Sequence, residues 1–172
     1  MSKVILLLAL ALPLPALAQD APRVEVSGGY AYAHLDRSDL HGGYGALDVS
    51  LGRSFGLELS GSLQSGSADD GTDIDRATLL LGPRFVWRRG GVTPFVYVLG
   101  GIVHDSTGLD VFDVSIRVKE TNAAGVLGVG LDVPLGRRWA VRVAADYLLQ
   151  DSEGDSEASR ASVGIVYRSG AR

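Results

Sequence analysis

The sequence predicts an all-β fold, an eight-stranded antiparallel up-and-down transmembrane β-barrel with a polar, ionic interior. Three observations support this prediction. Polar and apolar residues alternate with a period of two along most of the chain. The segments that show this pattern are joined alternately by tight turns and by long polar connections. Charges are confined to one side of these segments, and the other side is continuously apolar.

The chain begins with the features of a secretory signal peptide. Lys3 precedes the apolar run Val4–Leu12, and a small-x-small cleavage motif ends at Ala18. The apolar run is too short to span a bilayer as a helix. We therefore expect residues 1–18 to be a secretory signal peptide and residues 19–172 to form one outer-membrane β-barrel domain.

The composition argues against several classes of function. The 172-residue chain has no cysteine, so disulfides and thiolate metal sites are not available to it. Its 20 acidic residues outnumber its 16 basic residues, which disfavours binding to nucleic acid. The sequence has no phosphate-binding loop, nucleotide fingerprint or zinc motif, and we expect no cofactor.

Eight segments show the alternation of strands, and most approach the ~9–11 residues with which a tilted strand crosses a bilayer. They are Arg23–His34, Gly43–Gly52, Leu57–Gln64, Arg76–Arg88, Val92–Val103, Thr121–Val133, Trp139–Leu149 and Ser159–Arg168. The connections expected to be long and polar are residues 34–42, 64–75, 104–120 and 150–158. An even number of strands joined in this way predicts a meander that closes on itself.

Two segments leave alternatives open. Val92–Val103 is apolar at both parities, so the pattern does not orient this strand. Leu109–Val118 alternates within the expected 104–120 connection. This segment fits either a loop or strands that continue beyond the membrane.

The charged side of the strands is expected to face the barrel interior. A charge at the bilayer midplane costs ~2–4 kcal/mol, so the uninterrupted apolar side should face lipid. A narrow eight-stranded lumen is filled by side chains, and arginine pairs bidentately with carboxylates. The expected interior ionic network consists of Glu25, Asp48, Glu58, Arg84, Arg88, Asp132, Arg142 and Asp146.

Aromatic residues on the apolar side gather near both ends of the strands. Amphipathic rings favour the headgroup region of a bilayer. Trp87, Trp139 and Tyr167 lie beside tight turns. Tyr30, Tyr32 and Tyr147 lie near the long connections. These two sets are the predicted aromatic girdles.

The hairpin GVGLDVPLGRRWAVRVAADY, Gly128–Tyr147, resembles the recurring unit of small outer-membrane β-barrels of the OmpA-like and porin-family type. GVTPFVYVLGG is similar to the Thr-Pro-aromatic entry to a glycine-rich strand in these proteins. The resemblance implies insertion in a Gram-negative outer membrane, with the long connections outside. The last strand departs from the family pattern, because Ser169 stands where members usually carry Phe.

The resemblance and the expected filled lumen together predict a non-enzymatic protein with a structural or surface-interaction role. Its expected partners are outer-membrane lipid and lipopolysaccharide, and the sequence identifies no external partner. A small-solute porin is the alternative. His104-Asp105-Ser106 also resembles the His-x-Ser pair of lipid A deacylases, but Ile102 and Thr107 differ from the residues that flank that pair.

Acidic and histidine-containing connections are candidates for cation binding. Asp69, Asp70, Asp73 and Asp75 offer hard oxygen ligands to divalent cations, although their spacing differs from that of an EF-hand loop. His34 and His41 flank a short connection that contains Asp36 and Asp39, which fits a surface metal site or simple solvated polarity. No resident metal site is expected.

Overall fold

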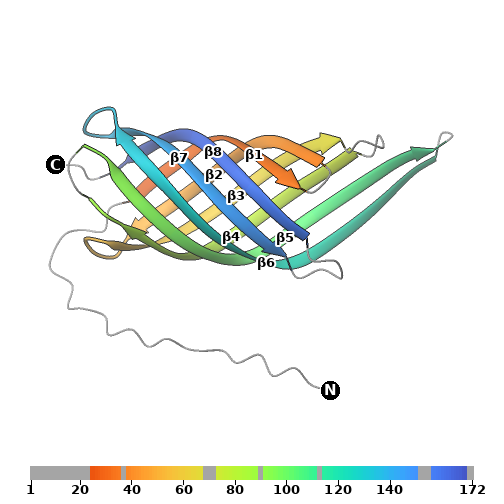
Figure 1. Ribbon diagram of the computed structural model, residues 1–172, viewed down its shortest axis with the longest axis horizontal. Helices are drawn as coiled ribbons and strands as arrows, with labels where there is room; N and C mark the ends of the chain where they lie inside the picture. Colours follow the sequence, from red (N-terminus) through yellow and green to blue (C-terminus); the bar gives the residue numbers. More distant parts are fainter. Residues whose placement is uncertain are drawn as a thin grey trace, which may run out of the picture.

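A computed structural model describes residues 24–35, 38–67, 73–88, 91–111, 114–150 and 156–169. The expected signal peptide, residues 1–18, lies outside the described residues. Eight antiparallel strands close into one barrel in which each strand pairs with the next and β8 pairs with β1 (Figure 1). The predicted fold class and the up-and-down strand order are confirmed. No helix in the described part of the chain is long and apolar enough to cross a membrane.

Seven of the eight strands are longer than the sequence pattern suggested, and β1 has the predicted length. Their bounds are β1 (Val24–Leu35), β2 (Ser38–Ser50), β3 (Phe55–Ser67), β4 (Asp73–Val86), β5 (Thr93–Val111), β6 (Val114–Pro134), β7 (Trp139–Gln150) and β8 (Ser156–Arg168). The hairpins β2–β3, β4–β5 and β6–β7 turn at one end of the barrel, which we call the short-turn end. The opposite end is the long-hairpin end.

The expected polar connection at residues 104–120 was wrong. β5 and β6 pair without interruption from His104 opposite Thr121 to Val111 opposite Val114. The hairpin projects well beyond its neighbours at the long-hairpin end (Figure 1). Its backbone groups are satisfied by the ladder itself, so the alternation of Leu109–Val118 belongs to strands.

Burial alternates along each strand and separates the interior from the outer surface. In β7, Ala140, Arg142 and Ala144 are buried, whereas Trp139 and Val143 are exposed. An apolar outer surface is what lipid contact requires, because hydrocarbon cannot solvate charges.

The structure also orients β5, which the sequence left open. Phe95, Tyr97, Leu99 and Val103 point inward, and Val98 is exposed on the outer surface. The interior therefore contains an apolar layer as well as ions, since Leu99 and Val103 join a buried cluster with Leu80, Val126 and Leu148. Continuous hydrophobicity at both parities is the expected pattern of a strand that faces lipid on one side and this cluster on the other.

Two glycines on the inner face of β6 make room for aromatic rings of β5. Gly130 lies opposite Phe95 and Gly128 lies opposite Tyr97 in the register. A Cβ atom added at Gly128 would come within 2.2 Å of the Tyr97 ring, and one at Gly130 within 2.3 Å of the Phe95 ring. Both rings thus lie across positions that only glycine leaves open.

Gly128→Ala is expected to lower the free energy of unfolding by about 1–3 kcal/mol, because the new methyl group must displace the buried Tyr97 ring. Gly125→Ala is the matched control on the same strand, since no atom lies within 4 Å of a Cβ built there. Denaturant titration of both variants from lipid vesicles measures the difference. Equal stability of the two variants would show that the ring is not tightly held.

Candidate functional site

Three carboxylates lie side by side on the inner face near the short-turn end. Glu25 of β1 is opposite Asp48 of β2, and Asp48 is opposite Glu58 of β3. All three residues are buried. Like charges directly across a strand pair repel one another, so this row requires cations from elsewhere in the barrel.

Arg84 on β4 supplies one of these cations. Its guanidinium lies 2.6 Å from Asp48 Oδ1 and 3.8 Å from both Glu25 Oε2 and Glu58 Oε2. It also donates from Nη2 to Asp132 Oδ2 on β6 at 3.3 Å. The Arg84 side chain is only 2% exposed, so these electrostatic contacts are screened little by solvent.

Arg142 on β7 supplies the second cation. It donates from Nε and Nη2 to the two oxygens of Asp132, at 2.8 and 3.1 Å, and from Nη1 to Asp48 Oδ2 at 3.0 Å. Asp132 lies directly opposite Arg142 in the β6–β7 register. Arg168 on β8 adds contacts of 3.2 Å to Glu25 and Asp132. The arginines therefore connect strands on different sides of the lumen.

The Phe95 ring fills the lumen beside these guanidinium groups. The Cζ atom of Arg84 lies 3.9 Å from the ring centroid, and that of Arg142 lies 4.9 Å from it. Arginine planes favour such positions over an aromatic face. Phe95 thus occupies space that paired ions alone would leave to water.

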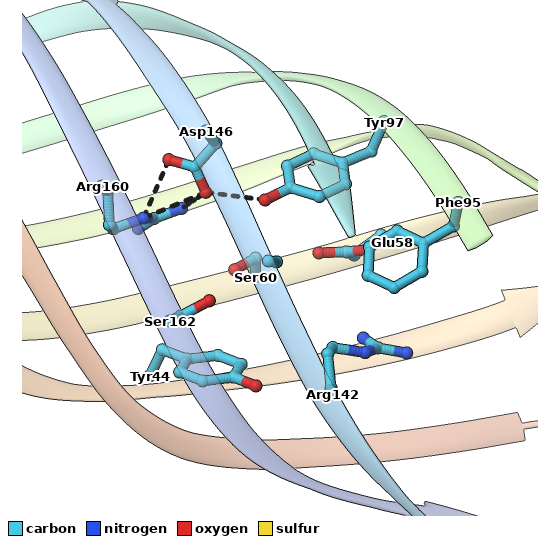
Figure 2. A pocket seen from close by; sticks show the side chains of 10 residues that line it. Tyr44, Glu58, Ser60, Phe95, Tyr97, Arg142, Asp146, Arg160 and Ser162 are labelled. Atoms are coloured by element: carbon cyan, nitrogen blue, oxygen red, sulfur yellow. Dashed lines mark hydrogen bonds and ion pairs between the residues drawn. The ribbon is translucent and has the colours of Figure 1, made fainter. Parts of the chain in front are cut away.

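A second ionic layer lies closer to the long-hairpin end. Arg160 on β8 donates to Asp146 on β7 at 2.9 and 3.0 Å, and Tyr97 Oη donates to Asp146 Oδ2 at 2.6 Å. Figure 2 shows these interactions around the Asp146 carboxylate. Still nearer that end, Arg76 donates to both oxygens of Asp105 at 2.7 and 2.9 Å.

A small cavity separates the two main layers. It has a volume of about 20 Å³, and Tyr44, Glu58, Phe95, Tyr97 and Arg142 contribute to its wall (Figure 2). About 10–15 Å³ suffices for one water molecule. The buried atoms Tyr44 Oη and Glu58 Oε2 have no hydrogen-bond partner among the described residues. A single water here would satisfy polar atoms without opening a channel.

The structure places seven of the eight predicted ionic residues inside the barrel and the eighth at its rim. Arg88 lies at the short-turn rim, where its side chain is 29% exposed and it donates to the Arg53 carbonyl oxygen and to Ser50 Oγ. The other seven are buried, namely Glu25, Asp48, Glu58, Arg84, Asp132, Arg142 and Asp146.

Sequence reasoning missed several members of this interior. Arg160 and Arg168 share a parity on β8 opposite to that of Tyr167, and Arg76 shares the parity of Arg84 on β4. Strand alternation was therefore sufficient to find these arginines. Phe95 and Tyr97 carried no such signal, because β5 is apolar at both parities.

The predicted girdle residues lie on the outer surface at the two ends of the barrel. Trp87, Trp139 and Tyr167 are exposed at the short-turn end, where the Trp139 and Tyr167 rings meet edge to face at 5.0 Å. Tyr30 and Tyr147 are exposed toward the other end.

Tyr32, the sixth predicted girdle residue, is half-buried and lies at the same end as Tyr30. It donates to Asp39 at 2.8 Å, and Tyr30 hydrogen-bonds to His41.

The local features that suggested other chemistry do not assemble into a recognisable centre. His34 pairs with Asp39 at 2.7 Å, and His104 Nδ1 hydrogen-bonds to Thr121 Oγ1 at 2.8 Å. The described residues include no group of three or more His, Asp or Glu side chains that could hold a metal ion. Of the acidic candidates, Asp36, Asp69 and Asp70 lie outside the described residues.

Comparison with known proteins identifies the family. The outer membrane protein beta-barrel domain matches residues 4–168. A search of curated proteins found no match. Among solved structures, Ail, the attachment invasion locus protein of Yersinia pestis, is 18% identical with a TM-score of 0.67, covering 86% of this chain and 99% of Ail.

Two further structures share the fold. Ail in complex with the heparin analogue sucrose octasulfate is 19% identical with a TM-score of 0.65, over 86% of this chain and 99% of that one. Neisserial surface protein A is 8% identical with a TM-score of 0.65, over 85% of this chain and 96% of that one.

Arg142→Ala is expected to lower the free energy of unfolding by about 3–5 kcal/mol, because it leaves Asp132 and Asp48 buried with fewer cationic partners. Arg137→Ala, in the exposed β6–β7 turn, is the matched control and should change stability little. Equilibrium unfolding in denaturant, with heat-modifiable migration as the test of folding, measures both. Similar losses for the two variants would contradict the interior role of Arg142.

Proposed function

The chain belongs to the outer membrane protein beta-barrel domain family, and on that premise we propose that it is a closed, non-enzymatic surface protein. Its barrel anchors the long-hairpin end at the outside of the cell, where the extended β5–β6 hairpin and the neighbouring connections meet external partners. The N-terminal residues 1–18 serve as the secretory signal peptide.

The observation that carries the proposal of a closed barrel is the side-chain content of the lumen. Arg84, Arg142 and Phe95 cross it at one level, and Tyr97 with the Arg160–Asp146 pair crosses it at the next. The cavity between these levels holds about 20 Å³, which suits one water and no hydrated ion. This filling favours an anchor over the alternative of a small-solute porin.

Planar bilayers containing the purified protein are expected to show no steady conductance. Phe95→Ala is expected to raise the frequency of brief openings, because it removes the ring that fills the space between Arg84 and Arg142. Val98→Ala, on the lipid-facing side of the same strand, is the control. Large, steady channels in the unmodified protein would support the porin instead.

No catalytic role is proposed for His104 and Ser106. Among the described residues His104 hydrogen-bonds to Thr121 Oγ1 and not to Ser106, whereas a nucleophilic serine needs a histidine within hydrogen-bond reach. Expression in a Gram-negative host should therefore leave the mass spectrum of lipid A unchanged. Loss of one acyl chain that depends on Ser106 would contradict this assignment.

We further propose that the external surface favours cations. The connections between β3 and β4 and between β7 and β8 contain Asp69, Asp70, Asp151, Glu153 and Asp155. Carboxylates attract divalent cations and repel polyanions. The surface would then differ in preference from that of Ail, whose complex contains a sulfated heparin analogue.

Isothermal titration is expected to give heat with Ca²⁺ and none with sucrose octasulfate. The double variant Asp69→Asn and Asp70→Asn should weaken the Ca²⁺ signal, whereas the double variant Asp110→Asn and Asp113→Asn, outside the two acidic connections, serves as the matched control. Binding of sucrose octasulfate without Ca²⁺ would overturn the proposed charge preference.

A further inference from the structure

Glu58 of β3 has weaker cationic contacts than the other buried carboxylates near the short-turn end. Its side chain is 7% exposed, and its one ion pair among the described residues joins Oε2 to Arg84 Nε at 3.8 Å. The closest arginine nitrogens lie 2.6 Å from Asp48, 2.8 Å from Asp132 and 3.2 Å from Glu25. Because the attraction between opposite charges falls with distance, Glu58 gains the least from being ionised.

The acidic neighbour of Glu58 makes its ionisation more costly. Asp48 lies directly opposite Glu58 in the β2–β3 register. Residues in such positions have Cβ atoms ~4.5–5.5 Å apart. Where two carboxylates share a buried site, one of them keeps its proton, because the site cannot accommodate two like charges. Asp48 contacts both Arg84 and Arg142, so Glu58 is the neutral member of this pair.

The charges at this level of the lumen balance when Glu58 is neutral. Among the described residues, the groups inside the barrel here are four carboxylates and three arginines, namely Glu25, Asp48, Glu58, Asp132, Arg84, Arg142 and Arg168. Arg88 adds a contact of 3.6 Å to Glu25 from the rim, where its side chain is 29% exposed and solvent screens its charge. A proton on Glu58 leaves three carboxylates and three guanidinium groups in the interior.

Two buried oxygen atoms fit a proton shared between these neighbours. Asp48 Oδ1 and Glu58 Oε2 both lack a hydrogen-bond partner among the described residues. An ionised carboxylate only accepts hydrogen bonds, whereas a protonated one donates from its O–H group. A proton on Glu58 therefore allows it to donate to Asp48. A water molecule in the small cavity beside Glu58 (Figure 2) can donate to the same carboxyl group, but it brings no charge that would offset a second ionised acid.

The other strands around Glu58 do not supply the missing positive charge. The titratable groups that line the cavity with it are Tyr44 of β2, Tyr97 of β5, Arg142 and Asp146 of β7, and Arg160 of β8. Arg160 lies 2.9 Å from Asp146, so this pair balances itself. Tyrosine side chains bring no positive charge. At the same level, β1 and β6 contribute the acids Glu25 and Asp132.

We propose that the lumen contains a proton-binding site, in which Glu58 stays protonated at neutral pH and donates a hydrogen bond to Asp48. The site lies inside the barrel and is independent of the surface role proposed above. It makes the stability of the barrel depend on pH, because the folded protein keeps a proton that the unfolded chain releases. Stability then falls as the pH rises above ~4–5, where an exposed glutamate ionises.

Infrared spectroscopy of the folded protein in ester-free detergent micelles tests the site directly. Exposed carboxyl groups are ionised at pH ~7, so a C=O stretching band of a carboxylic acid at this pH reports a buried proton. We expect the band in the unmodified protein and in Glu120→Gln, which makes the same change in the extended β5–β6 hairpin, and its loss in Glu58→Gln. Absence of the band from the unmodified protein, as when a bound cation supplies the charge, would overturn the proposal.

Two further measurements assign the proton to Glu58. Glutamate labelled with ¹³C at the side-chain carboxyl should shift the band of the unmodified protein, which gives an answer even if Glu58→Gln does not fold. An unshifted band would place the proton on an aspartate and overturn the proposal.

Urea unfolding between pH ~5.5 and ~7 provides the second measurement. The folding equilibrium constant of the unmodified protein, relative to that of Glu58→Gln, should fall about tenfold per pH unit, because the amide has no proton to lose. The same pH dependence in Glu58→Gln and Glu120→Gln would contradict the site.

Discussion

The structure depends on one electrostatic constraint, the neutralisation of adjacent buried carboxylates by arginines from across the lumen. Glu25, Asp48 and Glu58 are neighbours on β1–β3, and none of these three strands supplies a cation to them inside the barrel. Arg84 and Arg142 bring that charge from β4 and β7. Because lipid bathes the outer surface, these charged side chains cannot point outward without a large energetic cost. They can therefore be paired only inside a closed barrel.

The same constraint explains why the lumen is filled. The arginine side chains extend across the lumen and occupy much of its cross-section. Phe95 and Tyr97 fill the remaining space, because Gly128 and Gly130 leave room for their rings. The interactions that stabilise the barrel thereby also obstruct it.

Sequence alone predicted the parts of this arrangement that follow from alternation. Asp132, Arg142 and Asp146 lie on strands with a clean period of two, so their inward direction could be derived. Which side chains of β5 face inward could not be derived, because both faces of this strand contact apolar surroundings. The extended β5–β6 hairpin was left open between a loop and continuing strands, since a polar segment that pairs with itself resembles a loop in sequence.

Other features depend on the register between paired strands, which cannot be read from the sequence. The carboxylate row joins residues from three strands that are well separated along the chain. Arg160, Arg168 and Arg76 were accessible from parity alone and were overlooked. Alternation thus defined which residues face inward, whereas partners required the closed barrel.

The most direct test is to measure which side of a strand touches hydrocarbon. The chain has no cysteine, so a nitroxide can be attached at Val143→Cys and separately at Ala144→Cys on β7. In lipid vesicles, collisions with oxygen should dominate at position 143, and the label at 144 should be immobilised and shielded from oxygen. The reverse pattern, with position 143 shielded and 144 in contact with hydrocarbon, would contradict the account.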